Sequence, residues 1–458
     1  MELNALLIFG ILAGCMVGVG LLLAFLRDFR FGFVITGVVF FISTLGVLEI
    51  QEFRISRTWL APLQDHRTAL MGALCGLVLC GLVAHAGRVS LRRIPGPGLM
   101  MLAVALYAGL LRMVHSSVED GLASIGLALL TVTPLIVLFP SLLDTWTDFE
   151  KLFKTIAITM VVWSGAVFIQ VFINREMLFA SAGFRSGFRF AGLTANPQAA
   201  SILLSVVAAT AFWLVLNTQR GLWRMTFIGL TGASVIMLLW TGSRTGMGMM
   251  VLAVAAVLYA RVGRAILAVP VLMVVGYGLY VVATAVLDID LGLNRLASTE
   301  DTRSWVWAKM WETAMDNPAI GVGVEDAEVS ENSLLFGFAS YGFGMALLLV
   351  TVMLVSFAQV LKLLRIRWGL AAEQRRIVDV ILGFYAAYFF GTIFEGYMIA
   401  RISAINVLFF MFAAMATRAI QLAQEHEAVE EYGDEGAEVT YAAYAYGAPA
   451  EPDSREYE

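Results

Sequence analysis

The sequence has little charge and little cysteine. Only 14% of its 458 residues are charged, and 60% are apolar, whereas soluble domains are roughly 45–50% apolar. The three cysteines, Cys15, Cys75 and Cys80, all lie inside apolar runs, so they indicate neither a disulfide framework nor a metal site. These shortages exclude an ordinary soluble domain.

Apolar runs of about 20 residues recur along almost the whole chain, and each can cross the roughly 30 Å of a bilayer's hydrocarbon as a helix. We therefore predict an all-α polytopic membrane protein with about 12–13 transmembrane helices and one long external loop that contains a short amphipathic helix. The predicted spans are residues 5–26, 31–49, 69–87, 99–114, 121–142, 154–174, 198–217, 225–241, 246–260, 265–285, 334–361, 377–396 and 403–417. No cleavable signal peptide is expected, because the first run is followed by Arg27 and Arg30 rather than by a small-residue cleavage site.

The basic residues divide unequally between the two sides of the predicted bundle. With the C-terminal tail in the cytoplasm, strict alternation of the spans places 17 Lys and Arg inside and 12 outside, in agreement with the positive-inside rule. The outside twelve are Lys309 and eleven arginines: Arg54, Arg57, Arg67, Arg112, Arg175, Arg185, Arg189, Arg244, Arg295, Arg303 and Arg401. Arginine grips phosphate with paired hydrogen bonds and keeps its charge, so the external face is predicted to bind a phosphate.

The external loop of residues 175–197 combines arginines, glycines and a helix start. Arg185 and Arg189 are four residues apart, among glycines that allow the backbone to approach a ligand closely. Thr194 or Asn196 can cap the next helix, which begins with a proline and points free N–H groups towards an anion. The alternative is an interfacial loop whose arginines reach out of the lipid.

The segment TGSRTG, residues 241–246, lies between two apolar runs with almost no loop. Arg244 must therefore lie at or just below the outer membrane surface. A charge in that place faces the bundle interior or a water-filled cavity far more often than lipid. We interpret Arg244 as a site residue, with a simple interfacial anchor as the alternative.

The longest polar interruption of the apolar series is residues 286–333. A helix is predicted from Ser298 or Thr299, with acidic residues at its positive end, to Asp316 before an Asn-Pro pair. At 3.6 residues per turn, one face of this helix carries Arg303, Trp307, Met310, Trp311 and Ala314. Apolar side chains at this spacing indicate packing against the bundle, which would hold Arg303 over the external cavity.

Two carboxylates lie close in sequence to the external ends of predicted spans. Glu331 is the acidic residue nearest the next span, and a partly desolvated carboxylate there can act as a general base; the alternative is a solvated acidic loop with Asn332 or Ser333 as a helix cap. Glu395 and Arg401 flank the last external loop, where they can pair with each other or with site residues. Structural pairing is the interpretation we favour for Glu395.

The chain divides into a membrane domain, residues 1–420, and a tail, residues 421–458. From Gln424 onward the tail carries eleven acidic residues, one arginine and five tyrosines, and it lacks Leu, Ile and Phe. Without the charges of this segment the formal charge of −5 becomes +5. The tail has too little apolar area to fold alone, so we expect it to be disordered and cytoplasmic.

Four motifs in this order resemble the O-antigen ligase and O-antigen polymerase superfamily of bacterial envelope proteins. They are FRFAGLTANPQAA (188–200), TGSRTG (241–246), TRSWVWAKMWETAMDNPAIGVG (302–323) and ENSLLFGFASYGFGMALL (331–348). The resemblance implies a metal-independent glycosyltransferase of the bacterial cytoplasmic membrane, with its active site on the external side. The implied donor is a glycan on a polyprenyl pyrophosphate, and the acceptor is a glycan or a lipid. No cofactor and no nucleic acid is implied, whereas a chain-length regulator and a flippase are implied as partner proteins.

Carried over to this sequence, the resemblance assigns the pyrophosphate to the external arginines and the proton of the acceptor hydroxyl to a base. We predict catalytic roles for Glu331, Arg244 and Arg189, and substrate binding by Arg185, Arg303, Asn196 and Asn332. Ligases of the superfamily have a histidine at the position of Glu331. The acid therefore favours a polymerase of lipid-linked repeat units over a ligase that transfers glycan to lipid A core or protein. A lipid-linked-glycan transporter is a further alternative, which the gathering of charge at one face and the lack of internal repeats disfavour.

Overall fold

In the computed structural model of the chain, the described residues are 16–46, 58–181, 188–219, 221–263, 303–327, 331–399 and 403–446. Within this part of the chain, nine helices are long and apolar enough to cross a membrane. The prediction of an all-α polytopic membrane protein is confirmed. The nine long helices are α4 (Arg67–Ala84), α5 (Gly96–His115), α6 (Val118–Ser141), α7 (Trp146–Asn174), α8 (Pro197–Asn217), α9 (Leu222–Trp240), α14 (Ser333–Ile366), α15 (Ala372–Phe394) and α16 (Ala404–Tyr446).

Shorter elements complete the described chain. Three of them are apolar helices: Met16–Arg27, the pair η1 (Phe29–Phe31) and α2 (Gly32–Thr44), and α10 (Arg244–Val262). Together with the nine long helices they coincide with twelve of the thirteen predicted spans, and the other, residues 265–285, lies outside the described residues. The remaining elements are α3 (Ala61–Asp65), η2 (Ala86–Arg88), η3 (Leu91–Arg93), η4 (Arg175–Leu178), α13 (Ser304–Asp316) and the antiparallel strands β1 (Phe179–Ser181) and β2 (Phe188–Phe190).

Polar side chains set where several helices begin. Ser117 accepts a hydrogen bond from the Asp120 N–H at the start of α6, at 3.0 Å. Thr145 and Asp148 form a capping box at the start of α7. Each cap satisfies an N–H group that the first turn of a helix leaves without a partner.

Helices α8, α15 and α16 form the centre of the bundle. They are the most buried of the long helices, and α15 carries Phe384, whose ring stacks on Phe412 of α16 with 4.0 Å between centroids. Helices α4, α9 and α14 lie towards the outside and expose apolar side chains such as Leu354. In a bilayer these exposed apolar faces contact lipid, so they require no protein partner.

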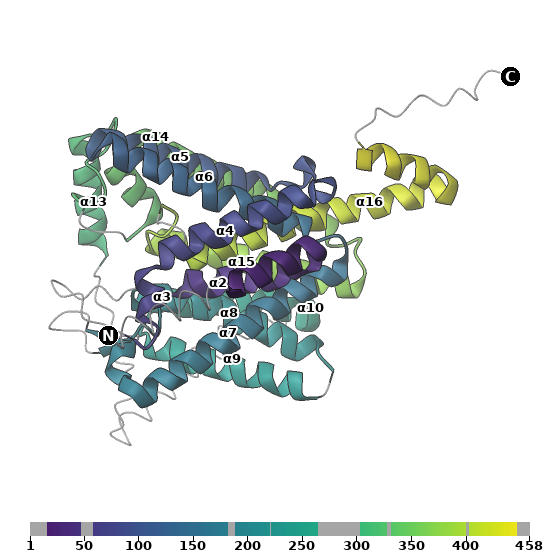
Figure 1. Ribbon diagram of the computed structural model, residues 1–458, viewed down its shortest axis with the longest axis horizontal. Coiled ribbons are helices and arrows are strands. Elements are labelled where there is room, and N and C mark those ends of the chain that lie inside the picture. Colours follow the sequence, from purple (N-terminus) through teal and green to yellow (C-terminus); the bar gives the residue numbers. More distant parts are fainter. Residues whose placement is uncertain are drawn as a thin grey trace.

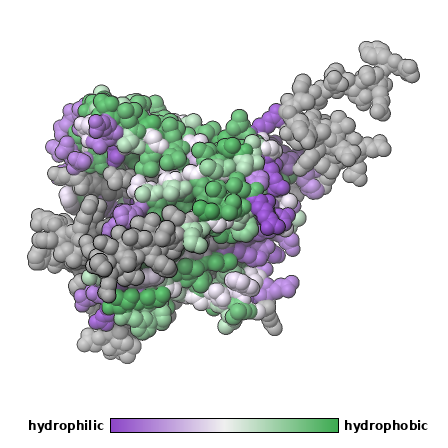
Figure 2. Space-filling view, in the orientation of Figure 1, coloured by the Kyte–Doolittle hydropathy of each residue, from purple (hydrophilic) through white to green (hydrophobic). Residues whose placement is uncertain are grey.

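The long helices run roughly side by side, and α13 lies across one end of them (Figure 1). This end is called the α13 end, and the opposite one, where α16 leaves the bundle, the α16 end. Figure 2 shows an apolar surface between the two ends, with hydrophilic side chains gathered at each of them. This distribution is that of a protein whose middle is surrounded by hydrocarbon.

At the α16 end a buried ion pair joins α14 to α15. Arg367, which follows α14, donates from Nε to the Asp379 carboxylate at 2.5 Å, and both side chains are almost fully buried. The helix α16 continues beyond residue 420 to Tyr446. It therefore enters the tail, for whose residues 421–446 we had expected no regular structure.

Candidate active site

The β1–β2 hairpin buries Arg189 at the α13 end. Arg189 lies on β2 opposite Ala180, and its side chain is 6% exposed. Its Nε donates a hydrogen bond to the carbonyl oxygen of Thr241, at 2.7 Å. Thr241 is the first residue of TGSRTG, so Arg189 connects the first two motifs directly. Arg185, predicted to bind substrate, lies outside the described residues.

Asn196 caps α8, as predicted for this position or for Thr194. Its side chain accepts a hydrogen bond from the Ala199 N–H at 2.7 Å, and Pro197 is the first residue of the helix. Thr194 is buried and donates to the carbonyl oxygens of Ala191 and Asn196. The established role of Asn196 is therefore structural. Its side chain is exposed, and its predicted contact with substrate stays a prediction.

The motif TGSRTG forms the turn from α9 to α10. Gly242 has a φ of 60°, which favours glycine, and Ser243 caps α10 by accepting from the Gly246 N–H. Arg244 is the first residue of α10 and is exposed, whereas Thr245 beside it is buried. The motif therefore presents one arginine outward and one hydroxyl inward from the same helical turn.

Helix α13 ends at Asp316 before the Asn-Pro pair, as predicted, but it begins at Ser304. The predicted start at Ser298 or Thr299 lies outside the described residues. The buried face consists of Val306, Met310 and Ala314. Trp311, which we had predicted on this face, is 53% exposed, because the face that packs is centred on Val306 and Met310 rather than on the tryptophans.

Arg303 immediately precedes α13 and contacts three other segments: the end of α15, the start of α10 and Glu331 before α14. Its Nη1 donates to the Phe394 carbonyl oxygen, and its Nη2 donates to the Thr245 hydroxyl at 3.2 Å and to Glu395 Oε1 at 3.3 Å. The guanidinium also lies over the Phe394 ring, 5.1 Å from its centroid, and Trp307 stacks on the same ring. The end of α15 therefore fixes the orientation of Arg303, whose charge can attract an anion.

Glu395 is the carboxylate nearest to Arg303. It follows α15 directly and is 8% exposed. Burial is the largest effect on this group, and together with the smaller repulsion from Glu331 it raises the pKa of Glu395 to about 7 against the opposing attraction of Arg303. From the sequence we predict that Glu395 pairs with Arg401 or with site residues, and favour a structural role; in the structure it pairs with Arg303.

Glu331 is a second carboxylate beside Arg303 and is less buried than Glu395. Its Oε2 is 3.9 Å from Arg303 Nη1, and its side chain is 33% exposed. This oxygen is inaccessible to solvent and has no hydrogen-bond partner among the described residues. A reacting hydroxyl can therefore reach Glu331 only through the exposed part of its side chain.

Asn332 is a helix cap. Its Oδ1 accepts from the N–H groups of Leu334 and Leu335, and its φ of 102° is unusual for a residue other than glycine. Ser333 donates to the Glu395 carbonyl oxygen at 2.7 Å. The start of α14 is thereby joined to the end of α15, and Glu331 and Glu395 both lie within 4 Å of Arg303.

Helix α14 is broken at Gly342, which has a φ of 75° and a ψ of −173°. The break leaves backbone groups that a continuous helix would satisfy, and the loop after α13 provides their partners. The N–H groups of Val322 and Gly323 donate to the carbonyl oxygens of Ala339 and Ser340 at 2.9 and 3.0 Å. A side chain at Gly342 would press on the backbone of Ala319. The Gly-Val-Gly turn of residues 321–323 therefore docks against a broken helix. This role was not predicted from the sequence.

The candidate site therefore joins segments that are far apart in the sequence. Arg189 contacts Thr241, Thr245 of the same turn contacts Arg303, and Arg303 pairs with both Glu331 and Glu395. Among the described residues no group of three His, Cys, Asp or Glu side chains is arranged to hold a metal ion. The site consists of arginines, hydroxyls and two carboxylates, which can bind an anion and move a proton.

The fold and this site define a polytopic α-helical membrane protein with a charged site at one end of its bundle. Comparison with protein-family models gives no match, and comparison with curated proteins gives no relative. The resemblance to the O-antigen ligase and polymerase superfamily therefore stays a prediction from the four motifs.

Proposed function

We propose that this chain is a metal-independent membrane glycosyltransferase that polymerises oligosaccharide repeat units linked to polyprenyl pyrophosphate. The observation that carries the proposal is the set of contacts made by Arg303. This side chain contacts Thr245 of TGSRTG, Glu395, and Glu331 of the last motif. Motifs that resemble those of one superfamily thus meet around a single arginine, which we propose binds the donor's pyrophosphate.

In the proposed reaction the acceptor hydroxyl attacks the anomeric carbon of the donor. A glycosidic C–O bond forms while the bond from that carbon to the pyrophosphate oxygen breaks. Glu331, whose side chain is 33% exposed, takes the hydroxyl proton on its carboxylate. Arg303 and the exposed Arg244 stabilise the charge that develops on the departing pyrophosphate.

Variants in the reconstituted protein test these roles. We expect Arg244→Ala and Arg303→Ala to abolish chain extension, whereas Arg175→Ala, an exposed arginine on η4, retains it. Glu331→Gln keeps the shape and removes the base, so we expect kcat to fall by about 100-fold or more with little change in the donor KM. Full activity of Glu331→Gln would refute the base assignment, and full activity of Arg303→Ala would refute the site.

The same assay separates the other candidate functions. A ligase would leave repeat units unextended and transfer a finished glycan when lipid A core or protein is added. A transporter would move labelled donor across the vesicle membrane without changing its mass. The acid at position 331, where ligases of the resembling superfamily have histidine, favours polymerisation.

We place the protein in the bacterial cytoplasmic membrane, with the α13 end external and the tail cytoplasmic. The excess of basic residues on the opposite side supports this orientation. Glu312 is exposed on α13, so Glu312→Cys in a background without the native cysteines should react with a membrane-impermeant maleimide in spheroplasts. Labelling only after the membrane is broken would reverse the orientation.

A further inference from the structure

Helix α13 exposes two rows of side chains besides the face that packs on the bundle. One row is uncharged and has the spacing of a single helical face: Ser304, Ala308, Trp311 and Met315. The neighbouring row has the same spacing and carries all three charged side chains of the helix: Trp305, Lys309, Glu312 and Asp316. They are named the uncharged row and the charged row. An exposed apolar surface beside a polar one is typical of a site that contacts a membrane or another protein.

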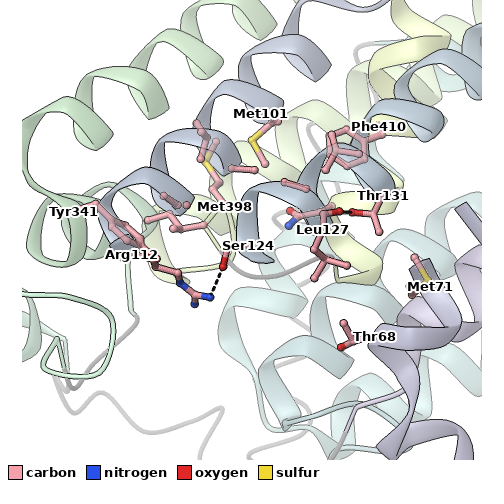
Figure 3. A pocket seen from close by; sticks show the side chains of 18 of the residues that line it. Thr68, Met71, Met101, Arg112, Ser124, Leu127, Thr131, Tyr341, Met398 and Phe410 are labelled. Atoms are coloured by element: carbon pink, nitrogen blue, oxygen red, sulfur yellow. Dashed lines mark hydrogen bonds between the residues drawn. The ribbon is translucent and has the colours of Figure 1, made fainter. Parts of the chain in front are cut away.

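Helix α14 changes its surroundings at the break at Gly342. Tyr341, before the break, is buried and lines a cavity inside the bundle (Figure 3), whereas Phe343, after it, is exposed. From there exposed apolar side chains recur every three or four residues and so lie on one face: Phe343, Leu347, Val350, Leu354, Phe357 and Leu361. In a bilayer this row contacts lipid.

The length of α14 beyond the break sets the depth of Phe343. The 24 residues from Phe343 to Ile366 extend about 36 Å at 1.5 Å per residue, which is enough to cross roughly 30 Å of hydrocarbon. Phe343 is the first residue of this length and lies at the α13 end, because its N–H donates to the carbonyl oxygen of Pro318, two residues beyond α13, at 2.8 Å. Phe343 therefore lies where the hydrocarbon ends and the lipid headgroups begin.

The uncharged row of α13 continues the lipid-facing row of α14. Trp311 contacts Phe338 edge to face, with 5.9 Å between the ring centroids, and Phe338 contacts Phe343 at 6.5 Å. Phe338 is half-buried, and both of its neighbours are exposed. The exposed apolar surface of α14 therefore extends through these rings to Trp311 on α13.

The direction of α13 also suits a membrane surface. The helix lies across the ends of the long helices (Figure 1), so its axis runs along the plane of the membrane that they cross. A helix in this position buries its apolar side about 5–10 Å into the boundary between headgroups and acyl chains. Tryptophan is enriched at this level, where its ring contacts hydrocarbon and its N–H remains near water.

We propose that α13 is an interfacial helix, which rests its uncharged row in the lipid leaflet at the α13 end and turns its charged row to water. Trp311 and Met315 provide most of the apolar surface that enters the lipid. The helix thereby holds Arg303, the residue before it, at the level of the lipid headgroups. The inference does not depend on the proposed glycosyl transfer, since it follows from the exposed side chains and the length of α14.

Spin labelling of the full-length protein in vesicles of phosphatidylethanolamine and phosphatidylglycerol tests this placement. A nitroxide is attached to single cysteines in a background without the native cysteines. Its collisions with oxygen, which dissolves in hydrocarbon, are compared with its collisions with a nickel chelate, which stays in water. The ratio of oxygen to nickel collisions should be at least about fivefold higher at Met315→Cys than at Asp316→Cys, the adjacent residue of the charged row. Ala308→Cys and Glu312→Cys form a second pair, for which we expect the same order.

Two other results would overturn the proposal. Nickel collisions at Met315→Cys as frequent as those at Asp316→Cys would place α13 in water, clear of the lipid. Infrequent collisions with both reagents at Met315→Cys would show that protein, such as a second copy of the chain, covers the uncharged row. Each labelled protein must keep the unfolding midpoint of the unlabelled one, so that a loss of fold is recognised.

The two exposed tryptophans of α13 provide a matched pair of variants. Trp311→Asp places a charge in the proposed interface, so it should draw the helix towards water and raise nickel collisions at Met315→Cys severalfold. Trp305→Asp adds the same charge to the row that already faces water and should leave these collisions unchanged. Equal effects of the two substitutions would contradict the placement of Trp311 in the lipid.

Discussion

The buried carboxylate Glu395 makes a pH-dependent contribution to the stability of this protein, and Glu395→Gln should remove that contribution. Burial raises the pKa of Glu395 from 4.5 to about 7, so between these values the folded protein holds a proton that the unfolded chain has released. Stability then falls as pH rises through this window. At 1.36 kcal/mol per pH unit, the loss between pH 4.5 and pH 8 is about 3 kcal/mol. The full loss of stability is reached only at pH values where Glu395 of the folded protein is ionised.

The assay is reversible unfolding in mixed micelles at pH 4.5, 6 and 8, followed by tryptophan fluorescence. Glutamine cannot ionise, so the unfolding free energy of Glu395→Gln should gain on the wild type by about 3 kcal/mol between pH 4.5 and pH 8. This difference does not depend on whatever the glutamine gains or loses in hydrogen bonds at a single pH. The control Glu312→Gln changes an exposed acid on α13 and leaves Glu395 in place. Parallel pH profiles for Glu395→Gln and the wild type would show that the burial argument is wrong.

Three further predictions concern stability and use the same unfolding measurement. Gly342→Ala should destabilise by about 2 kcal/mol or more, because the break in α14 needs positive φ and close contact with Ala319, whereas Gly126→Ala, with open space around its Cα, should not destabilise. Asn332→Ala should cost about 1–2 kcal/mol through the lost cap and the positive φ, and Asn332→Gly less; equal losses would argue against the strain. Asp379→Ala should cost about 3–5 kcal/mol by leaving the buried Arg367 without its partner, and replacing both residues by apolar ones should restore most of the loss; an unrestored double variant would contradict the ion-pair account.

The sequence predicts the architecture of this protein well because the bilayer restricts the choices. A run of about 20 apolar residues has one stable solution in lipid, a helix, and each predicted span within the described residues coincides with a helix. Local start signals were equally informative. Asn196 before a proline predicted the start of α8, and the Asn-Pro pair after Asp316 predicted the end of α13.

The arrangement of the site was less predictable, because it depends on contacts between distant segments. Charge on the external side directed attention to Arg189 and Arg303, but no local pattern shows that Arg189 would donate to Thr241 or Arg303 to Thr245. The burial of Glu395 is likewise a tertiary effect, since the residue follows a span as many exposed acids do.

The break in α14 was missed for a related reason. Gly342 lies in an apolar run whose composition is that of a continuous helix. The break is stable only because the backbone at Val322 and Gly323 satisfies the carbonyl oxygens that it leaves. Periodicity in the sequence reports which face of a helix is buried, but it does not report a loop that replaces helical hydrogen bonds.

The measurement that most directly tests the central claim is the mass of the product formed by the purified protein in vesicles that contain only a polyprenyl-pyrophosphate-linked oligosaccharide. We predict a ladder of products that differ by one repeat unit, retained by Arg175→Ala and lost in Arg303→Lys, which keeps the charge but not the paired donors. A donor whose mass is unchanged after incubation with folded wild-type protein would contradict the proposal that the Arg303 cluster is the active site of a polymerase.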